Sequence, residues 1–195
     1  VYLHLWRKLL QEKKSGKEEV QWSDQLLQAF RAAQDALKDN KALTIPTQDD
    51  TLWIVTDASV QPGAVGATLY AVRNGEPKLA EFFNVKLPEF QTRWLPCEVE
   101  GIAIGTALHH FAPYIIQSKE KPQVLTDSKP CVQAVQKMCK GQFSSSARLS
   151  TFLSAVSRYQ AQVRHLSGEA NLPSDFASRH PVSCDNKACQ ICTFV

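Results

Sequence analysis

The chain has 195 residues, 44% of them hydrophobic, and a formal net charge of +3. This composition excludes wholesale disorder, and the sequence shows neither a membrane-spanning apolar run nor a signal-peptide pattern. The small positive charge permits a polyanionic partner without requiring one. Six cysteines with no sign of secretion predict reduced thiols and a cytoplasmic location. The first residue is not Met, which suggests a fragment of a longer protein.

The first fifth of the chain predicts a helical appendage. Residues 1–22 are charged and helical in pattern, and Ser23 is a suitable N-cap for the next helix. That helix carries apolar residues at helical spacing, namely Leu26, Leu27, Phe30, Ala33 and Leu37. A helix this short gains its stability by burying such a face. We therefore expect the appendage to pack against the rest of the chain or an absent neighbour, and to contribute position rather than chemistry.

A Thr-Asp dipeptide follows apolar strand residues at two places. Residues 52–55 are apolar and predict a buried strand that leads to Asp57, and residues 123–126 lead in the same way to Asp127. If the two strands are neighbours, the two carboxylates lie a few ångströms apart. Like charges held so close need a metal ion or a shared proton.

The segment between these strands predicts two more strands in antiparallel order. Residues 64–72 are small and apolar, with Gly66 allowing a close backbone approach. Asn74-Gly75 is a strong hairpin signal and leads into a partly alternating segment, residues 78–87.

Residues 96–111 predict a helix that carries two glutamates. Glu100 shares a helical stripe with five apolar residues, Ala103, Ile104, Ala107, Leu108 and Phe111. Glu98 shares a mixed stripe with Gly101 and Gly105. We therefore expect Glu100 on the core-facing side, and Glu98 in solvent as a partner of the helix dipole.

The remaining elements complete a mixed α/β pattern. We expect helices over residues 130–138, after Ser144–Ser146 and over 172–178, and a fifth strand over 163–166. The last helix carries Asp175. The order β-β-β-α-β-α-α-β-α predicts an α/β (α+β) fold: a five-stranded mixed sheet flanked by helices, preceded by the helical appendage.

Four motifs in this order resemble the ribonuclease H (RNase H) domain of gypsy-type LTR-retrotransposon and retroviral-like reverse transcriptases. The motifs are Thr56-Asp57-Ala58-Ser59, Glu98-Val99-Glu100-Gly101, Thr126-Asp127-Ser128-Lys129 and Asn171-Leu172-Pro173-Ser174-Asp175. Trp22, Ala29-Phe30 and residues 42–46 resemble the tether that leads out of the polymerase thumb. The resemblance divides the chain into a tether (1–50), an RNase H domain (51–180) and a Cys-rich tail (181–195). No Tyr-x-Asp-Asp motif is present, so this piece should not polymerise DNA.

The resemblance implies a site for two Mg²⁺ ions, for which Mn²⁺ can substitute, held by Asp57, Glu100, Asp127 and Asp175. Asp57 would bridge the ions, Glu100 and Asp127 would hold the one near the leaving oxygen, and Asp175 would hold the other. Hydrolysis of a phosphodiester needs an activated water and neutralised charge, which two hard cations with carboxylate ligands supply.

The implied substrate is the RNA strand of an RNA–DNA hybrid, read by its shape and backbone. Candidate backbone contacts are Lys129, Lys137, Lys140 and Arg148, although for each one taken singly a solvated basic residue is the better interpretation. Two alternatives stay open. The domain could be a catalytically silent connection or nucleic-acid-binding module, or another two-metal nuclease or integrase of the same superfold.

Two features lie outside the four motifs. Many RNases H carry a flexible loop with a histidine before the last aspartate. Here the nearest histidine, His165, lies in a predicted strand, so we expect it to be a packed or edge residue.

The tail carries zinc-ligand residue types at His180, Cys184, Cys189 and Cys192. The spacing of Cys189 and Cys192 suits tetrahedral Zn²⁺, and the alternative is a tail of reduced thiols.

Overall fold

The computed structural model describes residues 23–38, 43–61, 63–142, 146–167, 171–179 and 189. The chain divides into two compact units, Val1–Ala42 and Leu43–Val195. In the first unit, helix α2 (Asp24–Lys38) begins at Ser23, whose hydroxyl accepts a hydrogen bond from the Leu26 N–H at 3.3 Å. The expected N-cap is therefore confirmed. Leu27 and Phe30 are partly exposed, and the side chains of Ala33 and Leu37 lie outside the part that the structure describes.

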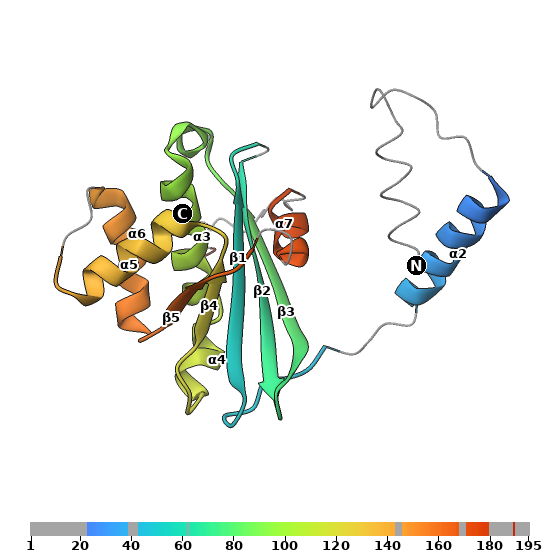
Figure 1. The fold of residues 1–195 in the computed structure, drawn as a ribbon, viewed down its shortest axis with the longest axis horizontal. Helices are drawn as coiled ribbons and strands as arrows, with labels where there is room; N and C mark the ends of the chain where they lie inside the picture. Colours follow the sequence, from blue (N-terminus) through green and yellow to red (C-terminus); the bar gives the residue numbers. More distant parts are fainter. Residues whose placement is uncertain are drawn as a thin grey trace. The chain divides into compact units, whose positions relative to one another are not determined.

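The second unit is built on the predicted five-stranded mixed sheet, in the order β3-β2-β1-β4-β5 (Figure 1). The strands are β1 (Thr51–Ser59), β2 (Ala64–Arg73), β3 (Glu76–Lys86), β4 (Gln123–Thr126) and β5 (Gln162–His165). The first three are antiparallel, whereas β4 and β5 run parallel to β1. Asn74 and Gly75 both have positive φ, as the tight hairpin turn between β2 and β3 requires.

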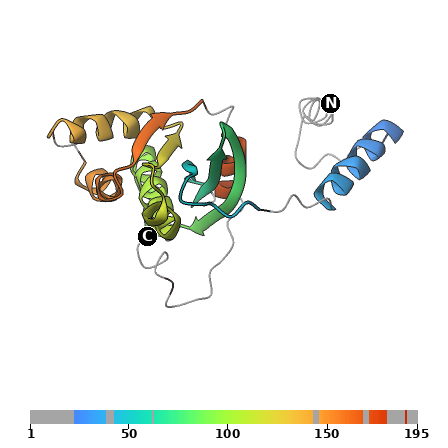
Figure 2. The same ribbon diagram turned by 90° about the horizontal axis from the view of Figure 1, so that it is seen from below.

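Helices cover both faces of this sheet, with α3 and α7 on opposite sides (Figures 1 and 2). The helical elements of this unit are η1 (Glu89–Arg93), α3 (Pro96–His110), α4 (Ala112–Gln117), α5 (Lys129–Cys139), α6 (Ala147–Arg158) and α7 (Leu172–Arg179). The short elements η1 and α4 were not expected from the sequence. The side chains of Leu149, Phe152, Leu153 and Val156 on α6 are buried, as predicted.

Helix α3 is buried on two sides, because the sheet covers one and α6 covers the other. Gly101 and Gly105 lie one turn apart on the side that meets α6. A Cβ atom on Gly101 would lie 2.6 Å from Leu149 Cδ1, and one on Gly105 would lie 2.9 Å from the carbonyl oxygen of Phe152. These glycines let the two helices approach closely, which places α3 and its glutamates in the middle of the domain.

An ion pair between the buried carboxylate of Asp50 and the partly exposed side chain of Arg73 holds the segment that precedes β1 against the sheet. Asp50 is 1% exposed and accepts two hydrogen bonds from the Arg73 guanidinium, at 2.7 and 2.8 Å. These bonds hold the pKa of Asp50 well below its usual range. The Thr44 N–H also donates to the carbonyl of Leu79 on β3. Residues 43–50 are therefore part of the folded body that carries the sheet.

Helix α7 packs on β2 at a position where only glycine fits. A Cβ atom on Gly66 would lie 2.6 Å from the backbone nitrogen of Ser178 and 2.7 Å from the carbonyl oxygen of Ser174. The close approach predicted at Gly66 is thus present. Because both contacts are with helix backbone, a side chain here displaces α7 instead of a flexible neighbour.

We predict that Gly66→Ala destabilises the protein by about 1–3 kcal/mol, as overpacking does, and loosens α7 more than other elements. Thermal unfolding measures the loss, and amide hydrogen exchange over 174–179 locates it. Gly141→Ala is the control for location: its positive φ makes alanine costly there too, but the added Cβ meets nothing within 4 Å, so the protection of α7 should not change. Unchanged protection of α7 in Gly66→Ala would contradict the prediction.

Candidate active site

The two Thr-Asp dipeptides lie side by side, as the sequence predicts. The parallel pairing of β1 with β4 ends at Thr56 and Thr126, which are partners. Asp57 and Asp127 are the next residue on each strand. β1 itself continues to Ser59, paired with β2, so Asp57 lies within the strand and not at its end. The pairing of β1 with β4 stops one residue before the two aspartates, so the two strands separate at Asp57 and Asp127.

Turn chemistry presents Asp127 at the end of β4. The Ser128 N–H donates to Thr126 Oγ1 at 3.1 Å, and the Ser128 hydroxyl caps α5 by accepting from the Cys131 N–H at 3.4 Å. Asp127 is thereby held between a strand end and a helix start.

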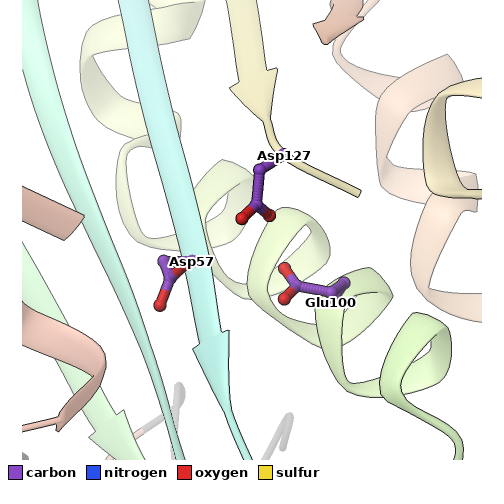
Figure 3. Close-up of side chains that lie close together, drawn as sticks. All are labelled: Asp57, Glu100 and Asp127. Atoms are coloured by element: carbon purple, nitrogen blue, oxygen red, sulfur yellow. The ribbon is translucent and has the colours of Figure 1, made fainter. Parts of the chain in front are cut away.

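Three carboxylates meet at this point (Figure 3). Asp57, Glu100 and Asp127 each offer an oxygen atom, and these atoms all lie within 4.8 Å of one another. They come from β1, the first turns of α3 and the end of β4. Oε2 of Glu100 is buried and has no hydrogen-bond partner among the described residues.

Burial and repulsion perturb two of the three acids. Burial raises the pKa of Glu100 to about 9, and the charges of Asp57 and Asp127 contribute to the rise. Burial also raises the pKa of Asp57 to about 6, with Asp175 and Asp127 adding to the effect and a hydrogen bond from Ser178 opposing it. A cluster that resists full ionisation in this way is suited to a divalent cation, which stabilises the charged forms.

Asp175 stands apart from the three clustered acids. It lies on α7, near enough for its charge to raise the pKa of Asp57, but its Oδ1 accepts a 2.7 Å hydrogen bond from Arg179 Nε. The structure therefore brings together three of the four residues that the sequence suggested, with the fourth on the adjacent helix.

The expectation that Glu98 faces solvent is wrong. Glu98 is 6% exposed, and its carboxylate accepts from the Leu95 N–H at 3.3 Å and the Ser146 hydroxyl at 2.7 Å. Arg148 lies 3.6 Å from the same carboxylate. The mixed stripe of α3 is covered by α6, so Glu98 caps α3 and joins the two helices. It takes no part in the three-acid cluster.

The four basic candidates fall into two groups. Lys129, Lys137 and Lys140 are exposed on or just after α5, which follows Asp127. Arg148 instead lies 4.7 Å above the Trp94 ring and close to Glu98, so the fold already uses its guanidinium.

His165 is exposed on the edge strand β5, as expected of an edge histidine. Of the four suggested zinc ligands only Cys189 is described. His180, Cys184 and Cys192 lie outside the described residues. No helix in the described part of the chain is long and apolar enough to cross a membrane.

Comparison with known families matches residues 22–122, more than half of the chain, to the RNase H-like domain found in reverse transcriptase. The chain is 25% identical over 177 residues to the enzymatic polyprotein of Carnation etched ring virus. It is 27% identical over 159 residues to the retrovirus-related Pol polyprotein from transposon 412 of Drosophila melanogaster. These matches cover 91% and 82% of this chain but only 26% and 12% of the two polyproteins.

Solved structures share the fold at low sequence identity. The foamy viral protease-reverse transcriptase in complex with RNA/DNA hybrid aligns with a TM-score of 0.51 at 16% identity, over 95% of this chain and 24% of that one. The same protein in complex with dsDNA aligns with a TM-score of 0.54 at 13% identity, over 85% of this chain and 34% of that one. LC11-RNase H1 in complex with RNA/DNA hybrid aligns with a TM-score of 0.50 at 13% identity, over 65% of this chain and 93% of that one.

We predict that the metal-free protein loses stability as pH rises between the ordinary pKa of glutamate, 4.5, and the folded-state value of Glu100, about 9. In that window the unfolded chain has released the Glu100 proton and the folded protein retains it, so a rise in pH favours unfolding. Melting temperatures in EDTA across this range measure the slope. Glu100→Gln, which cannot titrate, should reduce the slope, most clearly above pH 6, where Asp57 no longer contributes. An undiminished slope in Glu100→Gln would show that another group is responsible.

Proposed function

The chain belongs to the family of RNase H-like domains found in reverse transcriptase, and from that premise we propose that it hydrolyses the RNA strand of RNA–DNA hybrids. The observation that carries the proposal is the cluster of Asp57, Glu100 and Asp127. A domain that serves only as a connection has no need of three clustered acids, two of which, Asp57 and Glu100, have raised pKa values. Their retention at the separation of β1 and β4 supports an active enzyme.

The donor set fits hard divalent cations. Carboxylate oxygens are the ligands that Mg²⁺ and Mn²⁺ prefer, and three of them lie within 4.8 Å of one another. The buried Oε2 of Glu100, which no described residue hydrogen-bonds, is an acceptor that a cation satisfies. Asp57, Glu100 and Asp127 would hold Mg²⁺, and Asp175 on α7 would contribute to a second ion.

When bound, such ions activate water and neutralise the charge that develops on the phosphodiester. The protein's part is to fix the ligands. β1 and β4 supply two carboxylates from adjacent positions in register, and α3 supplies the third from a helix that is buried on both sides. Rigid elements therefore hold all three, which is the preorganisation that this chemistry requires.

The hybrid as substrate is supported by what related proteins bind. The foamy viral enzyme and LC11-RNase H1 are both in complex with RNA/DNA hybrid. A hybrid is read through its minor-groove shape, phosphates and 2′-hydroxyl groups. Lys129, Lys137 and Lys140 are the exposed cations that we assign to phosphate contacts, because α5 starts directly after Asp127. We leave Arg148 out of this set, because its guanidinium already contacts Glu98 and Trp94.

The domain belongs, in this proposal, beside a polymerase. The chain spans about a quarter and about an eighth of the two polyproteins that it resembles. We assign the segment that carries α2 to a tether which positions the nuclease without contributing to its chemistry. A Zn²⁺ site at His180, Cys184, Cys189 and Cys192 is an accessory proposal, and zinc content by elemental analysis decides it.

We predict that the purified chain cleaves a labelled RNA–DNA hybrid in Mg²⁺ or Mn²⁺ and not in EDTA. Asp127→Asn and Glu100→Gln should lower the rate by at least about a hundredfold, because each removes charge that holds the cation. Glu98→Gln is the matched control: it makes the same chemical change two residues away on α3, outside the cluster, and should retain cleavage.

Two results would overturn the proposal. Hybrid binding without cleavage at any enzyme concentration would favour the silent connection module. Cleavage of duplex DNA in place of the hybrid would favour another nuclease or integrase of the same superfold.

A further inference from the structure

Helix α7 is fastened to β1 by three buried polar side chains. Asn171, just before the helix, and Ser174 and Ser178 within it, are each at most 1% exposed. Ser174 donates a 3.0 Å hydrogen bond to the carbonyl of Val55 and pairs with the hydroxyl of Thr68 at 3.1 Å. These contacts, one with the backbone of β1 and one with a side chain of β2, account for how the helix docks.

The other two side chains reach the carboxylate of Asp57 itself. The Asn171 amide donates to the carbonyl of Thr56 at 3.1 Å and to Asp57 Oδ1 at 3.2 Å. The Ser178 hydroxyl lies 2.5 Å from Asp57 Oδ2 and 3.0 Å from the carbonyl oxygen of Asp175, and it donates to the nearer acceptor, the carboxylate. Both acceptors of the amide are oxygens, so the NH₂ group must face them, and the orientation of Asn171 is fixed.

Each oxygen of Asp57 therefore receives one donor from the α7 side. A carboxylate oxygen has two lone pairs, so each retains one for a cation. The two donors restrict rotation of the carboxyl group about its bond to Cβ and favour its ionised form. Gly66, the β2 partner of Asp57, allows Ser178 to come this close, because a side chain at position 66 would push the Ser178 backbone away.

We propose that Ser178 is a positioning residue, whose hydroxyl orients the carboxylate of Asp57 for a divalent cation. This inference rests on the proposed function, in which Asp57 holds such ions. Ser178 touches neither substrate nor reacting atoms and acts through Asp57. Hydrogen-bond donors behind metal ligands typically contribute about 10- to 100-fold in metal affinity or activity.

Ser174 provides a matched control for docking of the helix. Ser174→Ala and Ser178→Ala each remove one buried hydroxyl from the same helix, four residues apart, and both replacements favour helix. Of these two serines, Ser178 contacts Asp57 and Ser174 does not. A role limited to docking α7 predicts similar effects from the two substitutions, whereas positioning predicts that they differ in metal binding.

The first measurement uses Ca²⁺ alone, without substrate, and follows the rise in melting temperature as Ca²⁺ is added. We expect the half-saturating Ca²⁺ concentration to increase about tenfold in Ser178→Ala and to stay within about twofold of wild type in Ser174→Ala. Equal values in the two variants would overturn the proposal.

The second measurement is hybrid cleavage at saturating Mg²⁺. We expect Ser178→Ala to lower kcat about tenfold with KM for the hybrid unchanged, because the hydroxyl acts on the metal ligand and not on the nucleic acid. A change in KM alone would also overturn the proposal. If wild type binds Ca²⁺ but fails to cleave hybrid, the proposed function fails, and the Ca²⁺ comparison still decides the role of Ser178.

Discussion

The placement of three carboxyl groups at one point, where β1 and β4 separate beneath α3, is the constraint on which the rest of this structure depends. Burial raises the pKa values of Glu100 and Asp57, and the ionised forms of the three acids repel one another, so ionising the whole cluster lowers the stability of the metal-free fold. Such an arrangement persists only where the surrounding elements leave the side chains no alternative. In this domain three contacts hold the side chains in place: the pairing of β1 with β4, the packing of α3 on α6, and the packing of α7 on β2.

Each of these three contacts depends on a close approach of two backbones. The register of β1 and β4 brings Thr56 and Thr126 together and leaves the next residue of each strand at the separation. The glycines of α3 let α6 cover the helix that carries Glu100. Gly66 lets α7 approach β2, so that polar side chains reach Asp57 from the opposite face. Small residues, more than the acids themselves, thus fix the geometry of the site.

Much of this could be predicted from the sequence, because the informative signals are local. The repeated Thr-Asp after apolar strands predicted adjacent carboxylates, Asn74-Gly75 predicted the hairpin, and the apolar stripe predicted that Glu100 faces the core. The error at Glu98 has a physical cause: a stripe of mixed polarity is solvent-facing only if no other element covers it. Which element covers it is a tertiary fact, although Gly101 and Gly105 at helical spacing were a signal of close packing.

The hydrogen bonds to Asp57 were beyond prediction for a related reason. Serine in a short helix reads as a neutral surface residue, and nothing in the local pattern of 172–178 connects Ser178 with a strand more than a hundred residues earlier. Only the docking of α7 at Gly66 makes that connection.

The most direct test of the central claim, that the three carboxylates form a divalent-cation site, is anomalous diffraction from crystals of the protein soaked in Mn²⁺. The account predicts anomalous density in direct contact with the carboxylates of Asp57, Glu100 and Asp127, and its loss in Asp127→Asn. Strong Mn²⁺ density elsewhere, with none at these three residues, would contradict it.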